Sequence, residues 1–169
     1  MEAPADLVAF VHRERPRLVR AADLLVGDRA VAEEIAQEAL VRACAHWERV
    51  RNLSSPGGWV HRVTLNLATS QLRRWRLERR ARTRLAREEI QAPPDSATTL
   101  AVRDALAGLP ARQRRVLVLH HVLGWSAVEI ADLDGATPEA VRQQLHRGRE
   151  AMRARYVAAD TREDASDVR

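Results

Sequence analysis

The fold is decided by residues 126–149, which read SAVEIADLDGATPEAVRQQLHRGR. Ser126 is followed three positions later by a glutamate, the spacing of a capping box, so a helix is predicted to begin here. Gly135 can adopt the positive φ of a tight turn. Thr137 and Pro138 have the residue types of an N-cap and of the first position of a second helix. Two helices joined by so short a turn predict a helix-turn-helix.

The second helix of this motif carries side chains suited to DNA. Arginine and glutamine donate hydrogen bonds to base edges in the major groove, and arginine also binds phosphate. Any pair of packed helices can share the glycine and the apolar spacing, but two cap signals and an arginine-bearing helix together favour DNA binding. The residues that we expect to contact DNA are Thr137, Glu139, Ala140, Arg142, Gln143, His146 and Arg147.

The rest of the chain has helical patterning as well. Apolar residues recur at steps of three and four through most of the sequence, so an all-α fold is predicted. Asp6 and Asp28 are predicted N-caps, and Pro16 is expected to break or kink the first helix. Residues 52–58 are predicted to form a loop, because they are rich in serine, glycine and proline. A long helix is predicted to begin near Trp59.

A change of composition divides the chain in two. Residues 88–98 hold two consecutive prolines among acidic and small polar residues, which are poor core material, so they predict a linker. We therefore expect two small helical domains, over residues 1–87 and 99–156. The tail, residues 157–169, is rich in charged residues and is predicted to be disordered.

The basic residues of the chain are all arginine and are unevenly placed. There are 28 basic residues against 23 acidic ones, and lysine is absent. Residues 1–60 hold 8 arginines against 9 acids, whereas residues 73–87 hold 8 arginines and the single acid Glu78. Because a guanidinium group stays charged and offers forked donors to phosphate, this block makes nucleic acid the leading partner class. A solvated arginine-rich helix, or a genome that favours arginine over lysine, would give the same count.

Several classes of protein do not fit this sequence. No apolar run reaches the roughly 20 residues that cross a bilayer, and the amino terminus lacks a secretory pattern, so a cytoplasmic protein without membrane insertion is expected. The single cysteine, Cys44, permits no internal disulfide and no cysteine-rich zinc site. The histidines are scattered and no catalytic motif is present, so neither an enzyme nor a metal or nucleotide cofactor is expected.

Two sets of motifs, in a fixed order, resemble a known family. Residues 109–149, through the segments LPARQR, WSAVEIA and VRQQLHRGR, resemble region 4 of bacterial sigma factors of the extracytoplasmic-function type, group 4 of the sigma-70 family. Residues 32–43, AEEIAQEALVRA, resemble region 2.2. The segments WVHR, NLA and LRR, at 59–62, 66–68 and 72–74, resemble regions 2.3 and 2.4.

The resemblance implies a polymerase-binding surface. In this family the region 2.2 helix docks on the clamp coiled coil of the largest subunit of RNA polymerase. The positions of this chain that match it, and that are therefore expected to contact polymerase, are Glu34, Gln37, Glu38 and Arg42. An anti-sigma factor is a further partner that the resemblance implies.

The resemblance also implies two DNA elements. Regions 2.3 and 2.4 read and open the minus-ten element, with residues 54–58 near an extruded base. Region 4 reads the minus-thirty-five element through the second helix of the helix-turn-helix. The chain itself would make and break no bond. The residues expected at the minus-ten element are Arg62, Asn66, Ser70, Arg73 and Arg74.

Some positions depart from the pattern of the family. Leu65 and Ser70 stand where arginine and aspartate are common, and Asp134 stands at a position that is usually apolar. Glu34 replaces a usual aspartate, and Cys44 replaces a frequent tryptophan and is expected to be a buried or half-buried filler. Two other functions are compatible with the residues: a stand-alone dimeric helix-turn-helix regulator, and an RNA-binding scaffold that uses the arginine-rich block.

Overall fold

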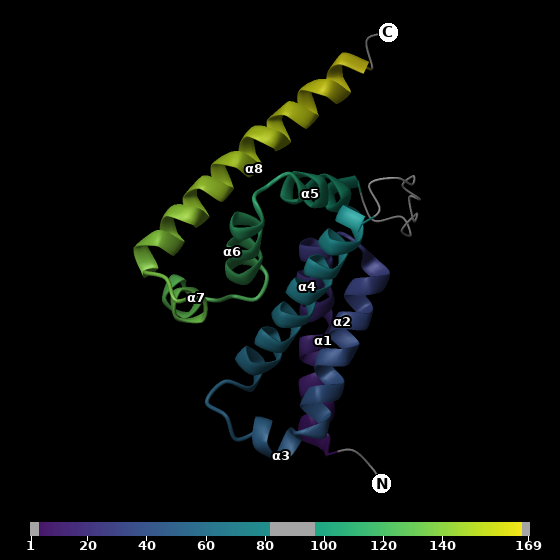
Figure 1. The fold of residues 1–169 in the computed structure, drawn as a ribbon, viewed down its shortest axis with the longest axis vertical. Helices are drawn as coiled ribbons and strands as arrows, with labels where there is room; N and C mark the ends of the chain where they lie inside the picture. Colours follow the sequence, from purple (N-terminus) through teal and green to yellow (C-terminus); the bar gives the residue numbers. More distant parts are fainter. Residues whose placement is uncertain (1–3, 82–96, 167–169) are drawn as a thin grey trace. The chain divides into compact units, whose positions relative to one another are not determined.

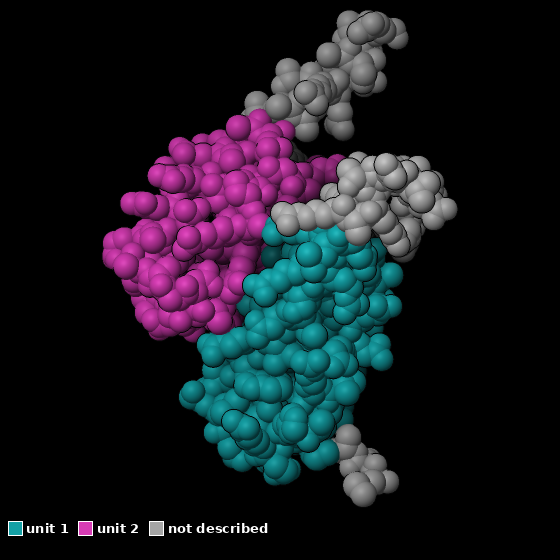
Figure 2. Space-filling view, viewed as in Figure 1, with its two compact units in different colours: residues 1–92 teal, residues 93–169 magenta. Residues whose placement is uncertain are grey.

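The described part of the chain is helical throughout. The computed structural model describes residues 4–81 and 97–166, in which there are eight helices and no strand (Figure 1). The chain divides into two compact units, residues 1–92 and 93–169 (Figure 2). The predicted all-α fold of two helical domains is therefore confirmed.

Unit 1, residues 1–92, has three long helices that pack on one another. The second and fourth helices both pack on the first, and they also contact each other. The core between them is aliphatic and aromatic; the rings of Phe10 and Trp47 lie 5.0 Å apart between centroids, and Leu18 is fully buried. The helices of this unit are α1 (Ala5–Val26), α2 (Arg29–Ala45), α3 (Trp47–Val50) and α4 (Pro56–Ala81).

Helix α1 differs from the sequence prediction at two points. It continues through Pro16, so the expected break at this residue does not occur. A proline removes the hydrogen bond to the carbonyl of residue 12, but Pro16 and His12 are both exposed, so water can satisfy that carbonyl while Phe10 and Leu18 pack on one core. The N-cap residue is Pro4 rather than Asp6. By contrast, Asp28 does cap α2, accepting a hydrogen bond from Val31 N at 3.1 Å.

Helix α4 begins at Pro56, three residues before the predicted start. The hydroxyl oxygen of Ser55 accepts a hydrogen bond from Gly58 N at 3.1 Å, which is an N-cap contact. Pro56 then takes the first helical position, where a missing N–H costs nothing. The predicted loop over 52–58 is therefore wrong for its last three residues, which are helical.

Unit 2, residues 93–169, is organised around its last helix, which packs on the other three. Val116, Leu119, Ile130 and Val141 are at most 2% exposed and form the centre of its core. Gly148 allows the last helix to approach Leu117 closely: a Cβ atom at this position would lie 3.0 Å from a methyl group of Leu117, so that side chain would have to shift. The helices are α5 (Ala97–Ala107), α6 (Ala111–His121), α7 (Ala127–Asp134) and α8 (Pro138–Ser166).

The predicted boundaries of unit 2 need two corrections. Helix α5 begins at Ala97, inside the last two residues of the predicted linker, most of which lies outside the described residues. Helix α8 continues to Ser166, although a disordered tail was predicted from residue 157. The cause of the extension is in the sequence: after Gly148 there is no proline or glycine, and alanine, arginine and glutamate favour helix.

Candidate functional site

The turn between α7 and α8 has the geometry of a helix-turn-helix. The hydroxyl oxygen of Ser126 accepts a hydrogen bond from Glu129 N at 3.2 Å, and the Glu129 carboxylate accepts one from Ser126 N at 2.8 Å. The Glu129 carboxylate accepts hydrogen bonds from both the N–H and the hydroxyl of Ser126, and these two bonds hold the pKa of Glu129 below its ordinary value. Gly135 has φ 61°, the left-handed conformation that favours glycine. The predicted capping box and turn glycine are confirmed.

The start of α8 is fixed by a second cap. The hydroxyl oxygen of Thr137 accepts a hydrogen bond from Ala140 N at 3.2 Å, and Pro138 is the first residue of the helix. Both features agree with the sequence prediction. Gly135, the C-cap of α7, and Thr137, the N-cap of α8, therefore fix the two helix ends that meet at the turn through local contacts.

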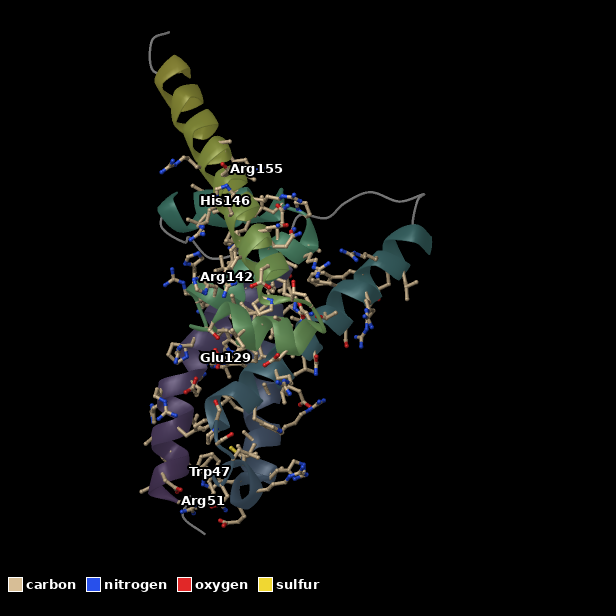
Figure 3. The ribbon with its side chains drawn as sticks, turned by 90° about the vertical axis from the view of Figure 1, so that its left-hand side faces the viewer. Trp47, Arg51, Glu129, Arg142, His146 and Arg155 are labelled. Atoms are coloured by element: carbon tan, nitrogen blue, oxygen red, sulfur yellow. The ribbon has the colours of Figure 1, made fainter. Side chains whose placement is uncertain are left out.

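The residues that α8 was predicted to offer to DNA share one exposed face. Ala140 is half-buried and the others are exposed, whereas Val141 and Leu145 are buried beneath them. Figure 3 shows Arg142 and His146 along this helix. Arg142 Nη1 donates to Glu139 Oε1 at 2.8 Å, and His146 Nε2 lies 3.4 Å from Glu150 Oε1.

An ion pair braces the same turn from α6. Arg115 Nη2 donates to Asp134 Oδ1 at 2.7 Å, and the Asp134 side chain is only 14% exposed. Asp134 is the last residue of α7, directly before the turn glycine. The departure from the family pattern at this position therefore has a structural reason: a charge partner on α6 takes the place of apolar packing.

In unit 1, α4 brings the residues predicted at the minus-ten element to its exposed side. Arg62, Asn66, Ser70, Arg73 and Arg74 are all exposed. The first four follow one another at steps of four, four and three, so they lie on one face. Leu65, another of the departures from the family pattern, is 2% exposed and belongs to the core of the unit. The arginine-rich block continues beyond these residues, but the structure does not describe the side chains of Arg80, Arg84 and Arg87.

Helix α2 presents the residues predicted to contact polymerase. Glu34, Gln37, Glu38 and Arg42 are exposed, and Arg42 Nε donates to Glu38 Oε1 at 2.8 Å. Between them lies an apolar side chain, Val41, which is 54% exposed. The opposite face of α2 is buried and apolar: Ala32, Ile35, Ala36, Ala39, Leu40 and Ala43.

Cys44 is exposed, which contradicts the expectation of a buried or half-buried filler. It follows Gln37 by seven residues, two turns of the helix, so it lies on the same exposed side of α2. The reason is the helical register: Ala43 and Trp47 occupy the buried positions on either side of it.

Sequence reasoning missed a buried polar pair that joins α1 to α4. Glu14 and His61 are 2% and 4% exposed, and His61 Nε2 lies 3.0 Å from Glu14 Oε2. Burial holds the pKa of His61 below its ordinary value of 6.5, although Glu14 opposes this effect. Burial would raise the pKa of Glu14, but hydrogen bonds from Arg13 and His61 outweigh it and lower that pKa. Both lowered pKa values are consistent with a neutral His61 that donates a hydrogen bond to a charged Glu14.

This pair predicts a loss of stability on mild acidification. Because the pKa of His61 is lower in the folded chain, the unfolded chain takes up a proton first as the pH falls below about 6.5. The stability of unit 1 is therefore full above that pH and falls as the pH drops toward the folded pKa. Chemical denaturation of the wild-type chain and of His61→Gln at a series of pH values tests this. A wild-type profile as flat as that of H61Q in this window would contradict it.

The described residues contain no helix that is long and apolar enough to cross a membrane. Within the same residues, no three histidine, cysteine or acidic side chains come together in a metal-binding group.

Comparisons with known proteins match both units. Residues 10–78 match the sigma-70 region 2 family, and residues 99–152 match the sigma-70 region 4 family. The first match includes the exposed faces of α2 and α4, and the second includes the helix-turn-helix.

Relatives align with nearly the whole chain. RNA polymerase sigma-E factor of Streptomyces coelicolor is 30% identical over 89% of this chain and 86% of its own length. ECF RNA polymerase sigma factor SigL of Mycobacterium tuberculosis is 31% identical over 89% of each chain.

Two solved structures share the fold. The sigma factor RpoE in complex with the anti-sigma factor NepR from Bartonella quintana has a TM-score of 0.76 at 21% identity, over 90% of this chain and 97% of that one. CnrH in complex with the cytosolic domain of CnrY has a TM-score of 0.63 at 23% identity, over 90% and 88%. On the two family matches and the aligned relatives, the chain belongs to the ECF RNA polymerase sigma factors and is a promoter-recognising transcription initiation factor.

Proposed function

We propose that this chain binds core RNA polymerase through the exposed face of α2 and delivers it to promoters. The face combines three features of a protein interface: charged side chains, an exposed apolar residue at its centre, and a rigid helix whose other side is buried. The observation that supports this assignment most directly is the exposure of Glu34, Gln37, Glu38 and Arg42 together on one helix. The relatives are named as RNA polymerase sigma factors.

DNA recognition is divided between the two units in this proposal. The exposed face of α4 takes the minus-ten element and the start of α8 takes the minus-thirty-five element. Asn66 suits a base edge, because an amide offers a donor and an acceptor side by side, and Arg73 and Arg74 suit phosphate. Capture of unstacked bases by unit 1 offsets the few kcal/mol that extrusion of a base costs.

The chain performs no bond chemistry in this proposal, and polymerase supplies the catalysis. It acts where the polymerase is, in the cytoplasm. A protein partner that occupies the α2 face would prevent this activity, so an anti-sigma factor is proposed as a regulator. Both solved neighbours were determined as complexes with such partners or with a partner's cytosolic domain.

Reconstitution with core RNA polymerase tests the function as a whole. Run-off transcription on candidate promoters is expected to require the chain, and size-exclusion chromatography is expected to show one copy bound to core. A stand-alone regulator would instead bind a palindrome as a two-fold dimer without polymerase. The proposal would be wrong if the chain bound DNA tightly as a dimer and did not support transcription initiation.

Replacing Arg73 and Arg74 together by alanine is expected to weaken minus-ten binding and to make it less dependent on salt. Each lost phosphate contact lowers the slope of log K against log salt by roughly 0.7–0.9. The measurement is the affinity of holoenzyme for promoter DNA over a salt series. Arg153→Ala, an exposed arginine of α8 outside the proposed DNA residues, is the matched control and is expected to keep the wild-type slope.

Replacing Gln143 by alanine is expected to change sequence preference rather than overall affinity. A base-edge contact is worth about 1–3 kcal/mol of discrimination. Competition between promoters that differ at single minus-thirty-five positions should therefore show relaxed preference at one base pair. Gln144→Ala is the control, because Gln144 is the next residue along the helix and its own side chain is half-buried. If Q143A and the wild type discriminate equally between these promoters, Gln143 does not contribute to recognition of the minus-thirty-five sequence.

A further inference from the structure

The exposed side of α1 is more basic than its sequence suggests. Beyond Asp6 the acids of this helix are Glu14 and Asp23, and they are 2% and 4% exposed. The arginines of the same helix all face solvent: Arg13, Arg15, Arg17 and Arg20. The acids are turned inward, so the formal balance of charge over residues 1–60 conceals a positive surface.

Two of these arginines lie at the seam between α1 and α4. Arg13 Nε donates to Glu14 Oε1 at 2.8 Å, and Arg17 Nη1 lies 3.9 Å from Glu14 Oε2. The same Oε2 atom contacts His61 Nε2 of α4 at 3.0 Å. Glu14 therefore ties both guanidinium groups to α4, at the residue that directly precedes Arg62.

The guanidinium groups of both arginines are accessible to solvent. The side chains of Arg13 and Arg17 are 60% and 43% exposed. A guanidinium stays charged and offers five N–H donors in a planar fork, which suits phosphate.

The seam is also ordered before any partner arrives. The guanidinium carbon of Arg13 lies 5.4 Å from the centre of the Phe10 ring, a cation–π contact. Arg13 and Arg17 are four residues apart, about 6 Å along the helix axis. A phosphodiester strand likewise presents anions a few ångströms apart, and each arginine that is already held in place loses less side-chain entropy on binding.

We propose that Arg13 and Arg17 bind the phosphate backbone of promoter DNA and extend the DNA surface of α4 across the seam onto α1. Nucleic acid is favoured over an acidic protein segment because His61, the residue of α4 at this seam, directly precedes Arg62, which is proposed to face the minus-ten element. This inference rests on the proposed function, since it requires that α4 faces the minus-ten element.

The test measures the affinity of holoenzyme for fluorescein-labelled promoter DNA with a pre-opened minus-ten region, over a series of potassium chloride concentrations. Replacing Arg13 and Arg17 together by glutamine is expected to make the slope of log K against log salt shallower by about 1.4–1.8, the value for two phosphate contacts. Arg13→Lys with Arg17→Lys keeps both charges and is expected to recover most of the slope.

Arg15 supplies the matched control. It is an exposed arginine two positions from Arg17, on the other side of α1, so R15Q is expected to keep the wild-type slope. R17Q alone retains the hydrogen bond between Arg13 and Glu14, which protects the fold, and is expected to lose about half of the effect. Thermal unfolding of each variant confirms that comparisons are made on folded protein.

The outcomes separate this inference from the proposed function. An unchanged slope in R13Q/R17Q, with a reduced slope in R73A/R74A, overturns the seam and leaves the minus-ten surface in place. Unchanged slopes in both variants would overturn both. A defect of R13Q/R17Q confined to binding a protein partner also overturns the inference, because it assigns the seam to the other class of macromolecule.

Discussion

Replacing Leu119 by alanine is expected to destabilise unit 2 by about 2–5 kcal/mol, the usual cost of a cavity at a fully buried leucine. Leu119 is 0% exposed at the centre of the core that α8 closes. For a unit of this size, such a loss lowers the melting temperature by roughly 10 °C or more. Hydrogen exchange read by mass spectrometry on separate peptides measures the effect in each unit.

The same variant tests whether the two units fold independently. Unit 1 has its own core, so its exchange protection is expected to match that of the wild type. Val128→Ala is the control within unit 2: Val128 is 50% exposed, and such surface changes usually stay within about 0.5 kcal/mol. Equal loss of protection in both units of L119A would show one cooperative structure instead of two.

Replacing Glu34 and Glu38 together by arginine is expected to abolish binding to core polymerase. If the α2 face docks as proposed, the reversal places like charges against the partner, which costs several kcal/mol. A loss of about 3 kcal/mol corresponds to roughly 100-fold in affinity. Fluorescence anisotropy of the labelled chain with core polymerase measures it.

A charge-matched control comes from the same unit. Glu48 and Glu78 are exposed but lie on α3 and α4, so E48R/E78R makes the same change in net charge away from the α2 face. It is expected to bind core polymerase within a few-fold of the wild type. Parallel losses in both variants would mean that overall charge, and not the α2 face, controls binding.

Local cap chemistry explains why the helix-turn-helix could be predicted so closely. The contacts of Ser126, Gly135 and Thr137 involve residues within five positions of one another, so the sequence contains all the partners. The same logic applies to Ser55 and Pro56, a serine–proline pair that caps α4 just as threonine and proline cap α8. That start was missed because two glycines follow it and favoured a loop.

Long-range contacts explain what the sequence could not show. Glu14 and His61 are 47 residues apart, and nothing near either of them indicates that they meet in the core. Counting charges over residues 1–60 treats Glu14 as a surface acid, although folding removes it from the surface. The partnership of Arg115 with Asp134 likewise depends on how α6 packs against α7.

For the proposed binding faces, the sequence predicts which side chains are exposed, but it does not determine which macromolecule binds them. Helical periodicity places polar residues on the outer side of α2, α4 and α8, and the structure agrees at every predicted position apart from the half-buried Ala140. Which macromolecule covers each face depends on chemistry between chains, so those assignments stay predictions until the variants above are measured.

The exposed thiol on α2 gives the molecule a natural attachment point for a reporter. Cys44 is the only cysteine among the 169 residues, and the absence of lysine leaves maleimide and amine reagents with few competing targets. A spin label or dye placed there would need no engineered background, and its position on the same side as Gln37 would make its mobility respond directly when a partner covers that helix.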